Sequence, residues 1–367
     1  MNLKTDDMKK SLYVLFLLIS ILGFSQSESK LEKQIIEVDR LAFLDPDSAL
    51  IVAKKIEPKL NDDRLKSKLL LAKGSAYSVK HLSSTALKSG FEALDISQKA
   101  KDSVMMVNTL GFIGNQYYIL KLNKKAINHL NRAETIIDFL NDASLNQMTA
   151  NIYFVKALIY KDNLDPAFAI TYFDKAIDAY NKIDDRSSVL NRNITKIQKG
   201  YSLLDIGKLD EAEAIFQEVI GVSELSKMTE VTSYAKVGLA FTYEKKKDYK
   251  SANAILLETE KQIGQSPNIG ILTEVYDALS QNYLDQNNAE QYFNYNRKLE
   301  KNILENDEIE TRSFSDLLKK NIESQNDEFD NNQNKFYLFV ILIILFTIGS
   351  LFYIRKKINQ LKSSNYH

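Results

Sequence analysis

The middle of this chain repeats a pattern of small and aromatic residues at a nearly constant interval. In four windows a glycine or alanine stands three positions before a tyrosine, and an alanine follows nine positions after that tyrosine. A fifth window keeps the spacing with leucine in place of tyrosine. The five alanines are Ala86, Ala126, Ala169, Ala212 and Ala252. Their intervals of 40, 43, 43 and 40 residues predict stacked copies of one small structural unit.

The residue types at these positions indicate that each unit is a pair of antiparallel helices. Two helices approach closely only where one of them presents a side chain no larger than a methyl group. The small residue of the first helix and the alanine of the second provide that contact. Four residues after the last four alanines, on one helix face, stand Leu130, Phe173, Phe216 and Leu256. We expect these side chains to pack against the next hairpin, because no single hairpin buries its own apolar face.

Two segments, IGNQYY at residues 113–118 and GKLDEAEAIFQEVI at residues 207–220, resemble the tetratricopeptide repeat. Asp45-Pro46 and Asp165-Pro166 are typical of the cap and first position of a second helix. The resemblance covers roughly residues 30–300. It implies an all-α, right-handed α-solenoid of about seven helical hairpins.

The sequence departs from the tetratricopeptide pattern in several ways. It has no tryptophan, Lys156 stands where a leucine is usual, and Gly90 replaces the aromatic residue of the unit that contains Ala86. The units are also longer than the common length of about 34 residues. A solenoid built from other kinds of helix pair therefore stays open as an alternative.

The composition supports long helices and argues against a highly charged partner. The 367 residues include only 12 glycines and four prolines, while 44% are apolar and 26% are charged. Lys+Arg and Asp+Glu balance at 48 each, so no net field draws the chain to nucleic acid. The absence of cysteine excludes disulfides, thiolate metal sites and cysteine nucleophiles.

The N-terminus predicts a signal peptide over residues 1–25. Residues 12–24 form an apolar run of 13 residues behind a lysine-bearing start, and polar residues follow at once. Gly23 and Ser25 are small residues at the positions that a signal peptidase requires. The FSQ ending resembles signal peptides of Bacteroidetes. A buried core helix is the alternative interpretation of this run.

The C-terminal part predicts a single transmembrane helix over residues 336–354. These 19 uncharged residues would measure about 28 Å as a helix, close to the hydrocarbon thickness of a bilayer. Aromatic residues stand at both ends, and the basic cluster 355–357 follows. Because positive charge stays in the cytoplasm, we expect a single-pass protein of a bacterial inner membrane, with a periplasmic repeat domain and a cytoplasmic C-terminus.

These segments divide the rest of the chain into a repeat domain at residues 26–300, a stalk at 301–335 and a short basic cytoplasmic tail at 355–367. The stalk is charged and rich in amides, yet it carries spaced apolar residues that predict a helix. Those residues do not keep a strict heptad, so a homodimer formed through the stalk stays open.

No motif predicts an enzyme, a cofactor site or a metal site. The three histidines are His81, His129 and His367, and none is spaced for metal binding. Serine-elbow and phosphate-loop motifs are absent. Carboxylate pairs at 62–63 and 184–185 fall between predicted units, where helix capping explains them.

The tetratricopeptide resemblance implies a concave surface lined by the first helices of successive units. Counting from the small residues places eight aromatic and amide side chains toward it, namely Asn115, Tyr118, Asn151, Phe154, Tyr201, Tyr234, Phe241 and Gln281. These positions are not consistently basic, which argues against a clamp for a terminal carboxylate. Aromatics with amides suit an extended or helical peptide. The alternative for each aromatic residue is packing between helices.

Repeat domain, stalk, single span and basic tail together resemble the membrane-anchored sensor half of Bacteroidetes repeat-containing regulators, without their output domain. We therefore expect a membrane-anchored, extracytoplasmic scaffold that binds a protein or peptide and passes occupancy to a partner in signal transduction. The alternative is a structural or assembly factor of the cell envelope that does not signal.

Overall fold

The computed structural model describes residues 30–163, 165–263 and 269–305, and beyond them residues 307, 308, 311, 315, 333, 336–343, 345 and 347. The chain divides into two units, Met1–Leu299 and Glu300–His367. The regular elements of the described residues are all helices. The predicted signal peptide at residues 1–25 and the predicted tail at 355–367 lie outside the described residues.

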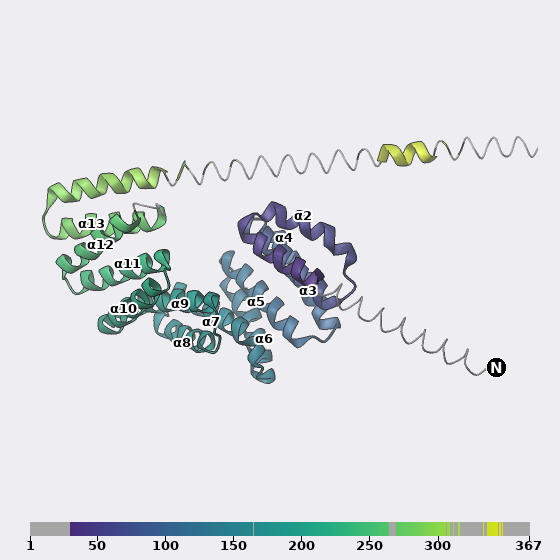
Figure 1. Ribbon diagram of the computed structural model, residues 1–367, viewed down its shortest axis with the longest axis horizontal. Coiled ribbons are helices and arrows are strands. Elements are labelled where there is room, and N and C mark those ends of the chain that lie inside the picture. Colours follow the sequence, from purple (N-terminus) through teal and green to yellow (C-terminus); the bar gives the residue numbers. More distant parts are fainter. Residues whose placement is uncertain are drawn as a thin grey trace, which may run out of the picture. The chain divides into compact units, whose positions relative to one another are not determined.

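Seven helical hairpins can be followed through the described residues of the first unit (Figure 1). They pair residues 30–44 with α2 (Pro46–Ile56), α3 (Asp63–Val79) with α4 (Ser83–Lys99), α5 (Ser103–Ile119) with α6 (Asn123–Leu140), α7 (Asn146–Asp162) with α8 (Pro166–Asn181), α9 (Arg186–Asp205) with α10 (Leu209–Leu225), α11 (Thr229–Lys245) with α12 (Tyr249–Ile263), and α13 (Ile269–Asp285) with residues 289–299. Two short 3₁₀ turns, η1 (Glu57–Lys59) and η2 (Ala143–Leu145), lie between hairpins. The predicted number of hairpins is confirmed; the right-handed sense of the solenoid stays a prediction.

The hairpins stack so that their first helices form one continuous layer. The first helices contact one another in series, α3 with α5, α5 with α7, α7 with α9, α9 with α11 and α11 with α13. Each first helix from α3 to α11 also contacts its own hairpin partner. The second helices α4, α8 and α10 contact the first helix of the following hairpin. This alternation leaves the first helices along one side, where they can line a shared surface.

The predicted close contact between the two helices of a hairpin is present. A Cβ added to Gly114 of α5 would lie 2.5 Å from Cδ2 of Leu130 and 3.4 Å from the carbonyl oxygen of Ala126, both on α6. The five repeated alanines are fully buried. The small residues therefore allow the close approach that the sequence pattern predicts.

Packing between hairpins depends on large side chains that enter spaces left by glycines. Phe216 of α10 is fully buried. A Cβ on Gly200 of α9 would lie 2.6 Å from its Cζ, and a Cβ on Gly238 of α11 would lie 2.3 Å from its Cε1. The ring thus joins two consecutive hairpins. Around Gly90, where the usual aromatic residue is missing, the ring of Phe112 from the next hairpin lies 3.0 Å from the position of a Cβ.

The nine-residue spacing between tyrosine and alanine reflects a repeated turn. The carbonyl oxygen of each pattern tyrosine accepts a hydrogen bond from the amide five residues later, for example 2.9 Å from Leu122 to Tyr117 and from Asp248 to Tyr243. Between these residues the backbone passes through the left-handed region, at Lys121 with φ 58°. This is the Schellman arrangement that ends many helices. The second helix then begins at the next residue, and its fourth residue is the buried alanine.

Aspartates cap the starts of several helices, as the sequence predicts. The side chains of Asp45 and Asp165 accept hydrogen bonds from the amides three residues later at 3.1 Å and 3.0 Å, each just before a proline. Asp62 and Asp185, from the two carboxylate pairs, do the same at 2.8 Å and 2.7 Å. The capping interpretation of these pairs is therefore confirmed.

The second unit is described only in part. Residues 336–343, 345 and 347 of the predicted transmembrane segment 336–354 are helical, and the remainder of that segment lies outside the described residues. Among the residues that are described, no helix is both long enough and apolar enough to cross a bilayer. In the predicted stalk, the described residues are 301–305, 307, 308, 311, 315 and 333, and all of them are helical.

Candidate functional site

A cavity of about 630 Å³ opens on the layer of first helices. Four successive first helices, α7, α9, α11 and α13, contribute to it. Its lining comprises Lys161, Leu190, Ile194, Ile197, Gln198, Tyr201, Glu230, Val231, Tyr234, Phe241 and Glu274. We call this cavity the groove.

The walls of the groove are mainly apolar, and the aromatic rings in them are supported from behind. Ile194 and Ile197 stand on α9, two turns and one turn before Tyr201. The ring of Tyr201 lies 6.3 Å from that of Phe241, another lining residue, and 5.5 Å from the buried ring of Phe216. Because neighbouring rings hold it in place, Tyr201 presents a pre-formed surface to a ligand.

Three polar groups of the groove have no hydrogen-bond partner among the described residues. They are the hydroxyls of Tyr201 and Tyr234 and the carboxylate of Glu274. Burial raises the pKa of Glu274 above its usual value. Burial, followed by the negative charge of Glu274, also raises the pKa of Tyr201. Convergent polar groups with perturbed pKa values in an apolar cavity are typical of a binding site.

The basic group of the groove already has partners. The Nζ of Lys161 donates a hydrogen bond to Oε1 of Gln198 at 2.8 Å and lies 5.4 Å from the centre of the Tyr201 ring. Burial lowers the pKa of Lys161, although the nearby carboxylates of Asp205 and Asp162 oppose this effect. Lys161 stands on α7, whereas Glu230 and Glu274 stand on α11 and α13. The charges of the groove are therefore separated by sign along the stack of helices.

Three of the eight predicted surface residues line the groove, namely Tyr201, Tyr234 and Phe241. Each is partly buried, so each combines packing with an accessible edge. They come from the two consecutive units whose first helices are α9 and α11. The count from the small residues thus predicts side chains that the fold brings together.

The other five predicted residues lie outside the lining of the groove. Tyr118 donates a hydrogen bond to Asp162 at 3.1 Å, and burial, with that carboxylate, raises its pKa to about 12. Asn151 accepts a hydrogen bond from Tyr180 at 2.7 Å. The ring of Phe154 lies 6.2 Å from the buried ring of Phe173. Asn115 is partly buried. Gln281 is exposed and donates a hydrogen bond to Asp285 at 3.2 Å. Tyr118, Asn151 and Phe154 take part in contacts between helices.

The sequence prediction missed the charged groups of the groove. Glu274, Glu230 and Lys161 do not occupy the same position in their units relative to the repeated small residues. A search restricted to repeated positions therefore omits them. The available signal was the occurrence of charged residues on first helices whose neighbours are apolar, such as Glu274 next to Val275.

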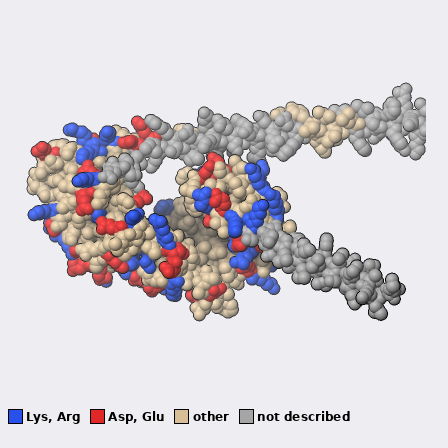
Figure 2. All heavy atoms as spheres, viewed as in Figure 1, with Lys and Arg blue, Asp and Glu red and all other residues tan. Residues whose placement is uncertain are grey.

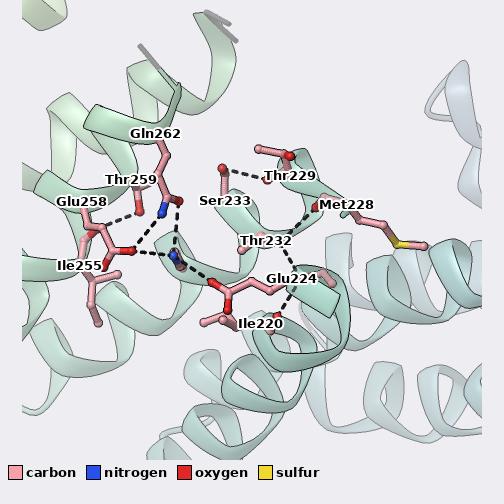
Figure 3. A network of polar contacts seen from close by, with 12 residues as sticks. Ile220, Glu224, Met228, Thr229, Thr232, Ser233, Ile255, Glu258, Thr259 and Gln262 are labelled. Carbon is pink, nitrogen blue, oxygen red and sulfur yellow. Dashed lines mark hydrogen bonds and ion pairs between the residues drawn. The ribbon is translucent and has the colours of Figure 1, made fainter. Parts of the chain in front are cut away.

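Ion pairs within and between hairpins connect the helices that carry the groove to their neighbours. Lys199 of α9 pairs with Asp174 of α8 at 2.5 Å. The Nζ of Lys236, which is buried on α11, lies 3.2 Å from Glu224 of α10 and 2.9 Å from Glu258 of α12 (Figure 3). Oε1 of Gln262 accepts a further hydrogen bond from Lys236 at 3.3 Å. Lys236 thus connects its own helix, α11, with α10 and α12.

Basic and acidic side chains alternate over the visible surface of the repeat region (Figure 2). Several of these charges form pairs that bridge two hairpins, such as Lys246 with Asp210 and Glu213, both at 2.6 Å. The hydrogen bonds that Lys246 donates to these two carboxylates raise its pKa above its usual value. Because such pairs are exposed, water and salt screen them, and each contributes little to stability.

Solved structures share this arrangement of helices. RapI in its apo form matches with a TM-score of 0.61 at 17% identity, over 74% of this chain and 76% of its own. Aspartyl phosphate phosphatase F from Bacillus subtilis matches with a TM-score of 0.51 at 14% identity, over 76% of this chain and 75% of its own. A STAND protein with a tetratricopeptide repeat sensor, from Pyrococcus horikoshii, matches with a TM-score of 0.51 at 16% identity, over 64% of this chain and 37% of its own. No family model and no curated protein matches the sequence.

The fold is that of a tetratricopeptide-repeat protein. The predicted all-α solenoid and its tetratricopeptide resemblance are thereby confirmed. At these identities the likeness extends to the fold alone. What this tetratricopeptide-type solenoid binds must be argued from the groove itself.

Proposed function

We propose that this chain is a membrane-anchored, extracytoplasmic scaffold that binds an extended peptide, or an extended segment of a protein, in the groove. The observation that carries the proposal is the set of unpartnered hydroxyl and carboxylate groups set among apolar walls contributed by four first helices. A peptide offers both kinds of group at regular intervals, since apolar side chains alternate with backbone amides and carbonyls.

The size of the groove supports a short ligand segment. Its volume of about 630 Å³ lies within the range of roughly 300–1,000 Å³ that is common for ligand pockets. Such a cavity holds a few side chains and excludes a folded domain. The hydroxyls of Tyr201 and Tyr234 can donate to backbone carbonyls of the ligand, while Ile194 and Phe241 contact its apolar side chains.

A binding role also accounts for the chemistry of the groove better than catalysis does. The described residues that line it are apolar, aromatic, amide or charged. Its one ammonium group, on Lys161, is engaged with Gln198. Among the solved structures with this fold, the STAND protein carries its tetratricopeptide repeats as a sensor. We extend that use to this chain. Binding of a peptide in its groove would then be passed as a signal to a partner across the membrane.

Replacement of Ile194 with glutamate tests peptide binding. A random hexapeptide library is first selected on the full-length chain, and the affinity of selected peptides is measured by fluorescence anisotropy. The substitution places an unpaired charge on the apolar wall, and we expect affinity to fall by about 100-fold, which corresponds to ~3 kcal/mol. The matched control is Leu225→Glu, because Leu225 is 88% exposed at the end of α10. Equal affinity for the wild-type chain and Ile194→Glu would contradict the proposal.

Deletion of residues 336–354 tests the anchoring. Eight large hydrophobic side chains among the described residues of this segment are 48–62% exposed, and the basic cluster 355–357 follows it. Lipid would cover such side chains, and basic residues favour the cytoplasmic side. We expect the full chain in the membrane fraction and the deletion variant in the supernatant of a periplasmic extract. Recovery of both chains from the same fraction would argue against the anchor.

A further inference from the structure

The groove is more acidic than its apolar walls require. Two of its lining residues carry carboxylates, Glu230 and Glu274, and a single lining residue carries a positive charge. That residue, Lys161, already donates to Gln198 and faces the aromatic ring of Tyr201. Among the described residues that line the groove, Glu274 is therefore a carboxylate for which the lining supplies no hydrogen-bonded cation.

The acidic groups are concentrated at one end of the groove. Glu230 stands in the first turn of α11 and Glu274 stands on α13, which contacts α11. Lys161 stands on α7, and α9 lies between α7 and α11 in the series of contacts. A ligand that crosses these helices therefore meets carboxylates at the α11–α13 end and an ammonium group at the α7 end.

The surroundings of Glu274 favour a cation more strongly than an exposed carboxylate would. Its negative charge reaches the hydroxyls of Tyr201 and Tyr234, and burial disfavours its ionised form and raises its pKa. A cation beside Glu274 would stabilise the ionised carboxylate and so replace the interaction with water that burial removes. The nearby tyrosine rings add a second attraction, because cations bind to the faces of aromatic rings.

We infer that the groove selects peptides in which a lysine or arginine side chain stands next to apolar residues, with the cationic group against Glu274 and the apolar side chains against Ile194 and Phe241. The inference rests on the proposed function and names the class of its ligand. An acidic peptide is disfavoured, because its carboxylate would be repelled by the carboxylate of Glu274. An arginine suits this end well, since its planar group can donate to a carboxylate and stack on a ring at once.

The first experiment selects random hexapeptides on the full-length chain and compares the residues that are enriched. We expect lysine or arginine beside leucine, isoleucine or an aromatic residue. Enrichment of apolar peptides without a basic residue, or with an acidic one, would overturn the inference and leave the proposed function intact. Recovery of peptides that Ile194→Glu binds equally well would instead contradict the proposed function.

The second experiment couples a charge on the peptide to a charge in the groove. A selected arginine peptide and its citrulline analogue, which is neutral and nearly isosteric, are titrated by fluorescence anisotropy against the wild-type chain and Glu274→Gln. We expect Glu274→Gln to weaken the arginine peptide about tenfold and to leave the citrulline peptide unchanged. Equal weakening of both peptides would indicate a structural effect and would overturn the assignment.

A control variant and a pH series separate charge recognition from loss of structure. Glu244 is also a partly buried carboxylate with a pKa that burial raises, yet it lies outside the lining of the groove. Glu244→Gln is expected to bind both peptides as the wild-type chain does. For the wild-type chain, affinity for the arginine peptide should fall as the pH drops toward the raised pKa of Glu274, whose neighbours in the groove are Lys161, Tyr201, Tyr234 and Glu230. A flat pH profile would overturn the assignment.

Discussion

Replacement of Phe216 with alanine is expected to lower the free energy of unfolding by about 3–5 kcal/mol. The side chain is fully buried, and its ring fills the space left by Gly200 in its own hairpin and by Gly238 in the next. Both helices that face the ring lack a side chain there. Neither can collapse easily to fill the cavity, which places the expected cost at the upper end of large-to-small substitutions.

Urea denaturation followed by far-ultraviolet circular dichroism measures this effect. The matched control is Phe139→Ala, because Phe139 on α6 is 87% exposed. We expect the control to change stability by less than about 0.5 kcal/mol. Equal midpoints for Phe216→Ala and the control would show that the ring does not join the two hairpins.

A second substitution tests the contact between Phe216 and Gly238 directly. Gly238→Ala alone should destabilise the chain, because the new Cβ would lie 2.3 Å from Cε1 of Phe216. When Phe216 is already alanine, the same methyl group has room. The two substitutions together should therefore cost less than the sum of the single costs, as a double-mutant cycle measures. Additive costs would contradict the contact.

Phe216 also links stability to the groove. Its ring lies 5.5 Å from that of Tyr201, and Tyr201 lies 6.3 Å from Phe241. Two lining residues are thus held by a side chain that sequence spacing identifies as a contact between hairpins. A stacked array transmits such a loss mainly to adjacent hairpins, since each unit contacts only its neighbours. The hairpins of α9–α10 and α11–α12 should therefore loosen first.

The parts of the fold that could be predicted from the sequence are those that repeat. The buried alanines, such as Ala126, the small residues opposite them and the aspartate caps each depend on one hairpin and one local geometry. The same turn requires the same spacing each time, so a single sequence contains several independent copies of the evidence. The number of hairpins follows from that repetition.

The groove could be predicted only in part, because it depends on side chains that do not repeat. Tyr201 and Tyr234 were found by counting along the units, but Glu274 and Lys161 were not. Asn151, which was placed on the same surface, has its carbonyl engaged by Tyr180. Periodicity identifies the face of a helix that lies inward. It does not indicate which inward residues are satisfied by a neighbouring helix.

The departure at Lys156 illustrates the same limit. A lysine at a position where leucine is usual suggests an exposed site, yet Lys156 is only 1% exposed. Its ammonium group forms an ion pair with Glu134 of α6 and lies 4.4 Å from the centre of the Tyr172 ring on α8. Burial alone would lower the pKa of Lys156, but its interactions with Glu134 and Tyr172 raise the pKa above its usual value. The two residues that compensate for burial of the Lys156 charge lie on two other helices. The sequence around Lys156 therefore does not indicate them.

These contacts predict an asymmetric response when the pair is broken. Glu134→Gln leaves the buried ammonium group of Lys156 without its carboxylate, and we expect a loss of about 3–5 kcal/mol in the free energy of unfolding. Lys156→Met replaces the lysine with an apolar side chain of similar length. Glu134 then keeps Lys175, whose Nζ lies 3.5 Å from its Oε1. We expect Lys156→Met to cost less than about 1 kcal/mol, because removing the buried charge also removes the cost of its desolvation.

Urea denaturation of both variants measures the asymmetry, with Glu92→Gln as the control. Glu92 forms an exposed pair with Lys88 at 4.0 Å, so its replacement should change stability by at most about 0.5 kcal/mol. The combination of Glu134→Gln with Lys156→Met should be more stable than Glu134→Gln alone, since no buried ammonium group then remains. If the double variant is instead the least stable of the three, the pair contributes through its own attraction, and burial of the lysine charge is not what makes Glu134 necessary.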